Sequence, residues 1–334
     1  MGVMSMPVEA MFWESLENNM VQCKLCPHNC RIKPNDSGIC RIRGNIDGKL
    51  YATGYAETTS LAMDPIEKKP LFHFKPGSYI LSVAPNGCNL CCKWCQNWEI
   101  SQSKVNTQHI DPDVLITIAL GERANGIAFT YSEPLIWYEY IIDVAKQGHS
   151  RNLSMVAVTN GYINPEPLEK ILPYIDAFNI DLKSMNPEVY KKHIGGKLEP
   201  VLETIKIAAK YKLVEITYLI IPTINDMEKE IHRLVDFIAE VNPDIPLHFS
   251  RYYPSYQFDV PPTSPEILMK AYQIAKQKLS YVYIGNLPIR GATDTRCPKC
   301  GNVLVKRHGF SATKPGITTD AKCSNCGRKV DIVL

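Results

Sequence analysis

Short apolar runs alternate with longer segments of helical period from about residue 79 to about residue 290. The runs are rich in β-branched residues, and this alternation is typical of parallel strands joined by helices. Seven strands are predicted, at residues 79–84, 126–130, 154–159, 177–182, 214–220, 247–250 and 281–284. The alternating stretch is shorter than the roughly 250 residues of a complete eight-fold barrel, so we expect an α/β fold with an open or partial barrel.

The helical segments between these strands carry clear start signals. Asp, Asn and Ser favour the N-cap, and proline favours the first helical turn because its φ is already suitable. The signals are Asp111 before Pro112, Asn164 before Pro165, Asn186 before Pro187, Ser264 before Pro265, and Asn225 with Asp226 before MEKEIHRLVDFIAEV. Chemistry in such folds collects at the carboxyl ends of the strands.

The two ends of the chain differ in character from its middle. The N-terminal part has hairpin signals, with Asp47 and Gly48 as a turn between ICRIRGN and KLYATGY. The C-terminal part is rich in glycine, lysine and cysteine. We therefore expect three parts: an N-terminal four-cysteine module with a hairpin over 1–75, a barrel over 76–290, and a zinc-ribbon-like module over 291–334.

Composition and charge narrow the range of functions. With 334 residues and 45% hydrophobic content, the chain is able to bury a substantial core. Its 37 basic and 34 acidic residues nearly balance, so no electrostatic case exists for nucleic acid or an anionic membrane as a partner. The sequence shows no apolar run of about 18 residues and no signal-peptide pattern at its start, which predicts a cytoplasmic protein.

The twelve cysteines fall into three groups of four. Disulfides are rare in a reducing compartment, and scattered core thiols would not cluster in this way, so metal ligation is favoured. The groups are Cys23, Cys26, Cys30 and Cys40; Cys88, Cys91, Cys92 and Cys95; and Cys297, Cys300, Cys323 and Cys326.

The central group carries the strongest chemical signal in the chain. An iron-sulfur cube takes one thiolate per iron, so a set of three leaves one iron open. Cys88, Cys92 and Cys95 have the spacing C-x3-C-x2-C, with Trp94 before the last cysteine. Cys91 offers the mirror spacing C-x2-C-x3-C, or a fourth ligand that would close the cluster. Zinc is a weaker alternative, because four thiolates within eight residues crowd a tetrahedral site.

With this motif the chain resembles the radical S-adenosylmethionine superfamily, in the branch that contains the pyruvate formate-lyase activating enzymes, over about residues 60–290. The segments CKLCPHNCRI, GICRIRGN and DPIEKKPLFHFKPGS, with the C-terminal cysteines, make it similar over nearly its whole length to the radical enzyme of the AmmeMemoRadiSam system. The resemblance implies a partial (β/α)6 barrel with a 4Fe-4S cluster and S-adenosylmethionine at its open end. It also implies reductive cleavage of the cofactor to a 5'-deoxyadenosyl radical.

The resemblance also implies residues that contact the cofactor. Glu133 stands at the acidic position of the superfamily's Gly-Gly-Glu motif, where it would meet the methionine amino group, with Tyr131 and Ser132 in place of the glycines. Asn160 belongs to a Thr-Asn-Gly segment that equally suits a plain turn. For Glu133 the alternative is an N-cap role at the helix near Pro134.

Two further strand ends carry candidate contacts. Asp181 and Lys183 match the family's Asp-Leu-Lys and imply contacts to the ribose and carboxylate of the cofactor; the alternative is a solvated strand end. Arg251 follows a later strand, and a looser match to the family implies that it contacts the adenosine or the substrate. Gly285 and Asn286 end the last strand, where the backbone is expected to approach the adenine.

The flanking cysteine groups predict two small metal sites. CPKCG and CSNCG are paired knuckles with zinc-ribbon spacing, although a single rubredoxin-like iron would use the same thiolates. Glycine suits the tight knuckle because it tolerates positive φ. The N-terminal C-x2-C-x3-C-x9-C group fits zinc or a second iron-sulfur cluster, with zinc slightly favoured and His28 as a substitute ligand.

Two functions remain open from the sequence. The first is an enzyme that abstracts hydrogen from a protein or small-molecule substrate, in one version as a glycyl-radical activating enzyme, with electrons from a donor such as ferredoxin or flavodoxin. The second is a non-catalytic iron-sulfur or zinc protein that acts as a redox relay or scaffold. The second predicts no affinity for S-adenosylmethionine.

Overall fold

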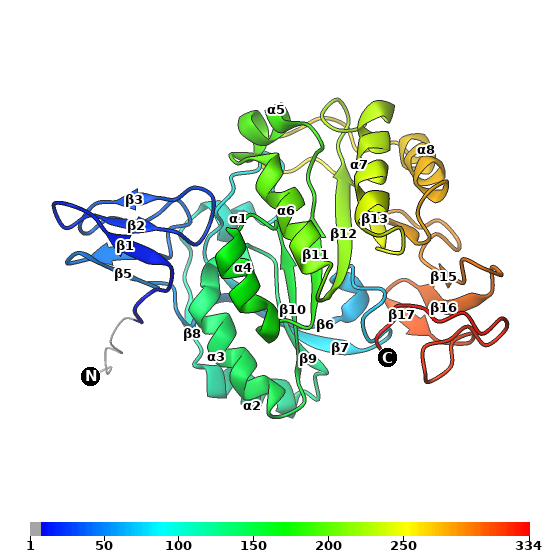
Figure 1. The fold of residues 1–334 in the computed structure, drawn as a ribbon, viewed down its shortest axis with the longest axis horizontal. Helices are drawn as coiled ribbons and strands as arrows, with labels where there is room; N and C mark the ends of the chain where they lie inside the picture. The colour runs from blue at the N-terminus through cyan, green and yellow to red at the C-terminus, as the bar shows by residue number, and fades with distance from the viewer. Residues whose placement is uncertain (1–7) are drawn as a thin grey trace.

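A nine-stranded sheet forms the centre of the computed structural model, which describes residues 8–334 (Figure 1). Seven of its strands pair in parallel. These are β7 (Tyr79–Pro85), β9 (Gly126–Phe129), β10 (Ser154–Thr159), β11 (Ala177–Asp181), β12 (Leu213–Ile220), β13 (Leu247–Arg251) and β14 (Val282–Gly285). All seven predicted strands are confirmed, with ends that differ by no more than one residue.

The sheet is open and not a closed barrel. It runs in the order β14-β13-β12-β11-β10-β9-β7-β6-β8, so β14 and β8 are its two edges. β6 (Glu57–Pro65) pairs antiparallel with β7, and β8 (Gln108–His109) pairs antiparallel with β6. This arrangement confirms the prediction of a partial barrel. β6 lies before the expected boundary at residue 75 and yet belongs to the barrel sheet.

Helices join the parallel strands. Four of the five predicted helix starts are confirmed, and the fifth helix begins at Glu228 with Met227, and not Asn225 or Asp226, at its N-cap. Asn186 accepts a hydrogen bond from the Glu188 N–H at 3.0 Å, and Ser264 accepts one from the Ile267 N–H at 3.4 Å. The helices are α1 (Trp98–Gln102), α2 (Pro112–Gly121), α3 (Tyr138–His149), α4 (Pro165–Ile171), α5 (Pro187–Val189), α6 (Leu198–Ala208), α7 (Glu228–Val241) and α8 (Pro265–Lys276). Short turns of other helix types are η1 (Ile66–Lys68), η2 (Pro134–Trp137), η3 (Leu172–Tyr174) and η4 (Tyr190–Ile194).

The core lies between the sheet and its helices. Ile127, Phe129, Ile216 and Phe249 on the strands are fully buried. Each such side chain stabilises the fold by about 1.5–3 kcal/mol relative to an exposed position. The packed strands therefore hold their carboxyl ends in fixed positions.

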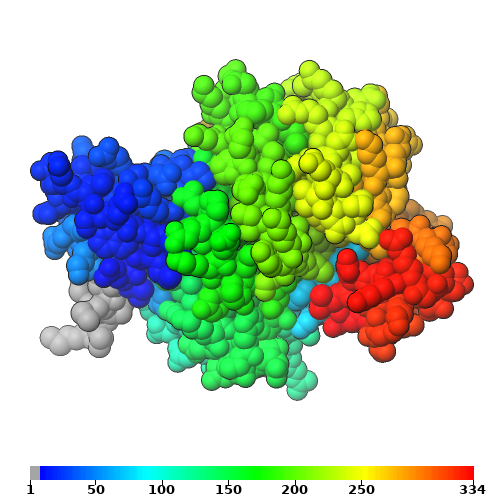
Figure 2. All heavy atoms as spheres, in the orientation of Figure 1, coloured from blue at the N-terminus to red at the C-terminus, as the bar shows by residue number. Residues whose placement is uncertain are grey.

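A small module precedes the barrel, drawn in blue in Figures 1 and 2. It contains β1 (Trp13–Ser15), β2 (Val21–Cys23) and β3 (Arg31–Ile32) in one sheet, and β4 (Gly44–Ile46) with β5 (Lys49–Tyr51) in a hairpin. Asp47 and Gly48 form the predicted hairpin turn, with φ angles of 51° and 82°.

A second module follows the barrel and lies at the opposite end of the molecule (Figure 2). It contains β15 (Thr295–Arg296), β16 (Val303–His308) and β17 (Ser311–Thr313). Lys75 donates its N–H to the Val333 carbonyl at 2.7 Å, and Val333 donates to the His73 carbonyl at 2.8 Å. The module is thus bonded to the chain between β6 and β7.

Within residues 8–334, the helices are too short or too polar to span a bilayer.

Candidate functional site

A cavity of about 420 Å³ opens at the carboxyl ends of the parallel strands. It is lined by the loop after β7 and by residues at or just after the ends of β9, β10, β11, β12, β13 and β14. Parallel strands bring the same end to the same rim, so residues far apart in sequence converge here. Its volume lies in the range of small-molecule sites.

Three of the four central cysteines line this cavity. They are Cys88, Cys92 and Cys95. Cys91 is exposed and is not among the lining residues. Its sulfur packs against Gly195, where a Cβ would lie 2.3 Å from Sγ. The loop therefore separates the C-x3-C-x2-C set from the fourth thiol.

Polar groups surround the sulfurs that face the cavity. Asn160 Nδ2 lies 3.6 Å from Cys88 Sγ, the Leu90 N–H lies 3.4 Å from the same sulfur, and Ser101 Oγ lies 3.2 Å from Cys95 Sγ. Burial raises the pKa of the Cys92 thiol to about 12. Metal binding would have to displace that proton. Three soft thiolates beside an open space fit an iron-sulfur cluster with one iron left free.

Glu133 has two roles in the structure. It lines the cavity, and its carboxylate accepts hydrogen bonds from Thr159 Oγ1 at 2.6 Å, the Asn160 N–H at 2.8 Å and the Leu135 N–H at 2.9 Å. The last bond caps η2, so the N-cap alternative is present together with the position at the cavity. Burial raises the pKa of Glu133 to about 7 despite these donors.

The two residues before Glu133 replace the glycines of the superfamily motif. Tyr131 adopts φ of 66°, a left-handed conformation that usually favours glycine. The turn is held because Ser132 Oγ donates to the Pro85 carbonyl at 2.8 Å and Asn97 Nδ2 donates to the Tyr131 carbonyl at 2.7 Å. The backbone therefore keeps a glycine-like path without glycine.

The ends of β10 and β11 supply the remaining predicted contacts. Asn160 lines the cavity and donates Nδ2 to Asn89 Oδ1 at 2.9 Å. Asp181 and Lys183 also line it, on either side of the buried Leu182, with Nζ 3.1 Å from Oδ2. Burial alone would lower the pKa of Lys183, but the Asp181 carboxylate together with Cys92 and Tyr190 raises the pKa above its usual value.

The last two strands place one predicted residue at the cavity and one elsewhere. Arg251 is not among the lining residues; it donates Nε to the Thr263 carbonyl at 2.8 Å and Nη1 to Tyr253 Oη at 3.1 Å. Ser250 lines the cavity instead, because successive side chains of a strand point to opposite faces. Asn286 after β14 lines the rim, as expected for that strand end.

One buried charged group at the cavity was not predicted from the sequence. Lys69 lines the wall and is 2% exposed, with Nζ 2.7 Å from Asp64 Oδ2 and 4.2 Å from the centre of the Tyr131 ring. The Tyr131 hydroxyl donates to the same Asp64 carboxylate. Burial lowers the pKa of Lys69 to about 8, although Asp64 opposes the shift. The segment DPIEKKP was the available signal, but two adjacent lysines normally indicate an exposed surface.

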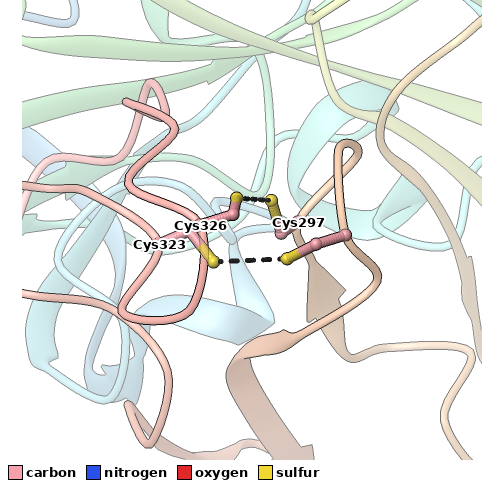
Figure 3. A group of neighbouring side chains, drawn as sticks. Cys297, Cys323 and Cys326 are labelled. Atoms are coloured by element: carbon pink, nitrogen blue, oxygen red, sulfur yellow. Dashed lines mark hydrogen bonds between the residues drawn. The ribbon is translucent and has the colours of Figure 1, made fainter.

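The C-terminal cysteines form a separate candidate metal centre. The sulfurs of Cys297, Cys300, Cys323 and Cys326 all lie within 4.8 Å of one another. Cys297 Sγ is 3.5 Å from Cys326 Sγ, and Cys300 Sγ is 3.6 Å from Cys323 Sγ (Figure 3). Thiolates bonded to one zinc at about 2.3 Å would lie ~3.8 Å apart at tetrahedral angles. The spacing suits a single ion.

The N-terminal cysteines line a small cavity of their own. Cys23, Cys26, Cys30 and Cys40 surround it, together with His28 and Arg43. Its other lining side chains are mostly aliphatic. The four thiols are therefore brought together by the fold, as the spacing predicted.

Comparisons with known proteins agree with this geometry. The family model described as the Radical SAM superfamily matches residues 82–238. The uncharacterised protein MJ0808 of Methanocaldococcus jannaschii is 45% identical over 98% of this chain and 99% of its own length. The 4-hydroxyphenylacetate decarboxylase activating enzyme of Clostridium scatologenes is 28% identical over 68% of this chain, a match that spans 66% of that enzyme.

The fold has a counterpart among solved structures. Streptococcus suis SuiB bound to S-adenosylmethionine matches with a TM-score of 0.50 and 14% identity, covering 60% of this chain and 48% of SuiB. At that identity the likeness concerns the fold alone. The family model matches the barrel strands, MJ0808 matches nearly the whole chain, and the cavity lies at the strand ends. These findings agree that the chain belongs to the radical SAM superfamily.

Proposed function

We propose that this protein cleaves S-adenosylmethionine reductively on a 4Fe-4S cluster held by Cys88, Cys92 and Cys95. Bound there, the cofactor would supply a 5'-deoxyadenosyl radical for hydrogen abstraction from a protein or small-molecule substrate. One observation carries the proposal: the three cysteines line the same cavity as Glu133, Asn160, Asp181 and Lys183. A scaffold or redox relay has no need for such polar groups around an open cavity.

The polar residues have distinct roles in this proposal. Glu133 accepts a hydrogen bond from the methionine amino group, on the carboxylate oxygen that takes only the Asn160 N–H. Lys183 attracts the cofactor carboxylate, and Asp181 accepts from the ribose. Asn160 holds Glu133 and Cys88 in place through its own hydrogen bonds. These contacts orient the cofactor against the cluster before any electron arrives.

Three further residues of the same cavity supply groups for the substrate. Lys68 and Lys69 follow β6, Tyr131 follows β9, and all three line the cavity. A lysine and a phenol favour a substrate with a carboxylate or carbonyl near the abstracted hydrogen. The similarity to an activating enzyme over 68% of this chain supports a protein substrate, with glycyl-radical activation as the most specific version.

The flanking C-terminal centre is proposed to hold zinc. Four thiolates with sulfur contacts of 3.5 and 3.6 Å support one tetrahedral ion.

The donor of electrons is proposed to be a low-potential protein such as ferredoxin or flavodoxin, because each cleavage of the cofactor consumes one electron.

The test is anaerobic reconstitution, followed by dithionite and S-adenosylmethionine, with 5'-deoxyadenosine measured by chromatography. Cys88→Ala, Cys92→Ala and Cys95→Ala are each expected to lower its formation at least 100-fold, because the cluster loses a ligand. Cys91→Ala is the matched control from the same loop and is expected to retain activity within about twofold. An intact, reducible cluster that yields no 5'-deoxyadenosine would reject the proposal, and equal loss in all four variants would reject the ligand assignment.

A further inference from the structure

The N-terminal cysteines differ from the C-terminal ones in how their sulfurs are spaced. Among residues 8–334, the C-terminal set is the only group of three or more Cys, His, Asp or Glu ligand atoms within 4.8 Å of one another. Cys23, Cys26, Cys30 and Cys40 share a cavity without meeting this spacing. Four thiolates bound to a single zinc ion lie closer to one another than 4.8 Å.

The wider spacing has a precedent within the same molecule. Cys88, Cys92 and Cys95 also line one cavity without lying within 4.8 Å of one another. In a cube each thiolate binds a different iron at a separate corner, so the sulfurs stay further apart than around one ion. In this respect the N-terminal set is like the central cysteines and unlike the C-terminal knuckles.

The two sites are connected by direct contacts between their loops. A Cβ at Gly87 would lie 2.3 Å from the Cys40 carbonyl oxygen, so the residue before Cys88 packs against the backbone of an N-terminal ligand. His28 Nε2 lies 2.6 Å from the Asn89 carbonyl. Asn89 then accepts from Asn160 Nδ2 at 2.9 Å, and that Nδ2 lies 3.6 Å from Cys88 Sγ.

A second connection reaches another central cysteine. Arg41, next to Cys40, donates Nη2 to the Ser101 carbonyl at 2.6 Å and Nη1 to the Gln102 carbonyl. Ser101 Oγ lies 3.2 Å from Cys95 Sγ. Covalent and hydrogen bonds together therefore connect the segment that carries the N-terminal cysteines to the residues that contact the sulfurs of Cys88 and Cys95.

The N-terminal cavity also offers a buried positive group. Arg43 lines it, is 1% exposed, and pairs with Glu139 at 2.9 Å, while its Nε has no hydrogen-bond partner among residues 8–334. A guanidinium that lines the same cavity as four thiols favours an anionic group among them. The aliphatic neighbours Leu25, Ile32 and Ile136 keep water away.

From these contacts we propose that Cys23, Cys26, Cys30 and Cys40 hold a second 4Fe-4S cluster that passes electrons to the central one. The proposal rests on the function given above. With four protein thiolates no iron is open, so this cluster carries electrons and does not bind substrate. A low-potential donor of the ferredoxin or flavodoxin class reduces it by one electron. The same electron then reduces the central cluster, and the second cluster returns to its oxidised state.

The first test is metal content after anaerobic reconstitution with iron, sulfide and zinc offered together. We expect about eight irons and about one zinc per chain, because two cubes need four irons each and the C-terminal knuckles take one ion. About four irons with about two zincs would overturn the second cluster. This measurement uses the unaltered protein, so it does not depend on the folding of a variant.

Paired variants assign the irons to their sites. Cys26→Ala/Cys40→Ala and Cys88→Ala/Cys92→Ala are each expected to lose about four irons and to leave a single-cluster electron paramagnetic resonance spectrum after reduction. Loss of zinc without loss of iron in the first variant would overturn the proposal. Loss of iron in the first variant alone would instead reject the central cluster while the N-terminal one stands.

The relay is tested by comparing two reductants. Dithionite is small and reaches either cluster, whereas a protein donor must dock. We expect Cys26→Ala/Cys40→Ala to lower the ratio of flavodoxin-driven to dithionite-driven 5'-deoxyadenosine formation at least tenfold. The control Cys91→Ala should leave that ratio as in the unaltered protein. An unchanged ratio in the double variant would overturn electron transfer through the N-terminal site.

Discussion

At the residue scale, Glu133 illustrates how one side chain serves both the fold and the site. Its carboxylate accepts three hydrogen bonds from Thr159, Asn160 and Leu135 and still lines the cavity. A carboxylate has about four acceptor positions, so three hydrogen bonds leave one for a cation. The capping role and the proposed cofactor contact therefore do not exclude each other.

The raised pKa of Glu133 predicts a pH-dependent affinity for the cofactor. Burial raises this pKa to about 7, so the folded protein loses the carboxylate charge as the pH falls through that value. We expect the affinity for S-adenosylmethionine to weaken by up to about tenfold per pH unit below 7, because the attraction to the amino group is lost. The measurement is equilibrium dialysis between pH 6 and 8 with the cluster oxidised, so that no cleavage occurs.

Glu133→Gln serves as the control for this titration. The amide keeps the size of the side chain but carries no charge, so its affinity should be low and nearly independent of pH. A flat profile in the unaltered protein would contradict the role given to Glu133.

At the scale of elements, the C-terminal knuckles depend on local turns. Gly301 and Gly327 follow their cysteine pairs with φ of 74° and 72°, and each donates its N–H to the carbonyl of the first cysteine of its knuckle, Cys297 or Cys323. Glycine adopts this conformation without strain, and this is why glycine was expected at the knuckles. The strands β15 to β17 are short and have few buried side chains, so the bound ion supplies much of the stability.

Removal of one knuckle ligand should therefore loosen the whole module. We expect Cys323→Ser to lose about one zinc per chain and to lower the Tm by roughly 2–4 °C for each kcal/mol lost. Metal analysis and limited proteolysis of residues 291–334 measure the two effects. Ser324→Ala, at the exposed neighbouring position, is the control and should retain zinc. Normal zinc content in Cys323→Ser would argue against a four-thiolate site.

At the scale of the whole molecule, a buried network joins the C-terminal module to the barrel. His73 donates Nδ1 to the Asp331 carbonyl at 3.0 Å and accepts at Nε2 from the Tyr283 hydroxyl at 2.8 Å. Its backbone N–H donates to Glu215, which also binds His248 at 2.6 Å. Three parts of the chain thus share one set of hydrogen bonds around His73.

The network predicts how stability depends on pH. Burial lowers the pKa of His73 to about 4, well below the 6.5 of an unfolded histidine. As the pH falls below 6.5, the unfolded chain takes up a proton that the folded chain does not, so the free energy of unfolding decreases. The contribution is about 2 kcal/mol between pH 7 and pH 5. Thermal unfolding of His73→Gln should show a correspondingly weaker pH dependence, while His308→Gln, at an exposed site, should match the unaltered protein.

Much of this architecture follows from local patterns. The seven parallel strands and four of the helix starts depend on runs of β-branched residues and on Asp, Asn or Ser before proline, which act within a few residues. The three cysteine groups are visible for the same reason, because ligands on one loop have a fixed spacing. Local rules also placed Glu133, Asn160, Asp181 and Lys183 at strand ends, and the parallel sheet then brings those ends to one rim.

What the sequence by itself determined is therefore the order of the elements and the kind of chemistry that the cysteine loops carry. Tertiary structure decided which side chains reach the cavity: Ser250 and not Arg251 faces it, since a shift of one position along a strand reverses the face. It also buried Lys69 against Asp64 and set Cys40 against Gly87. Burial and contact between distant segments depend on the packing of the whole chain, and no local pattern contains them.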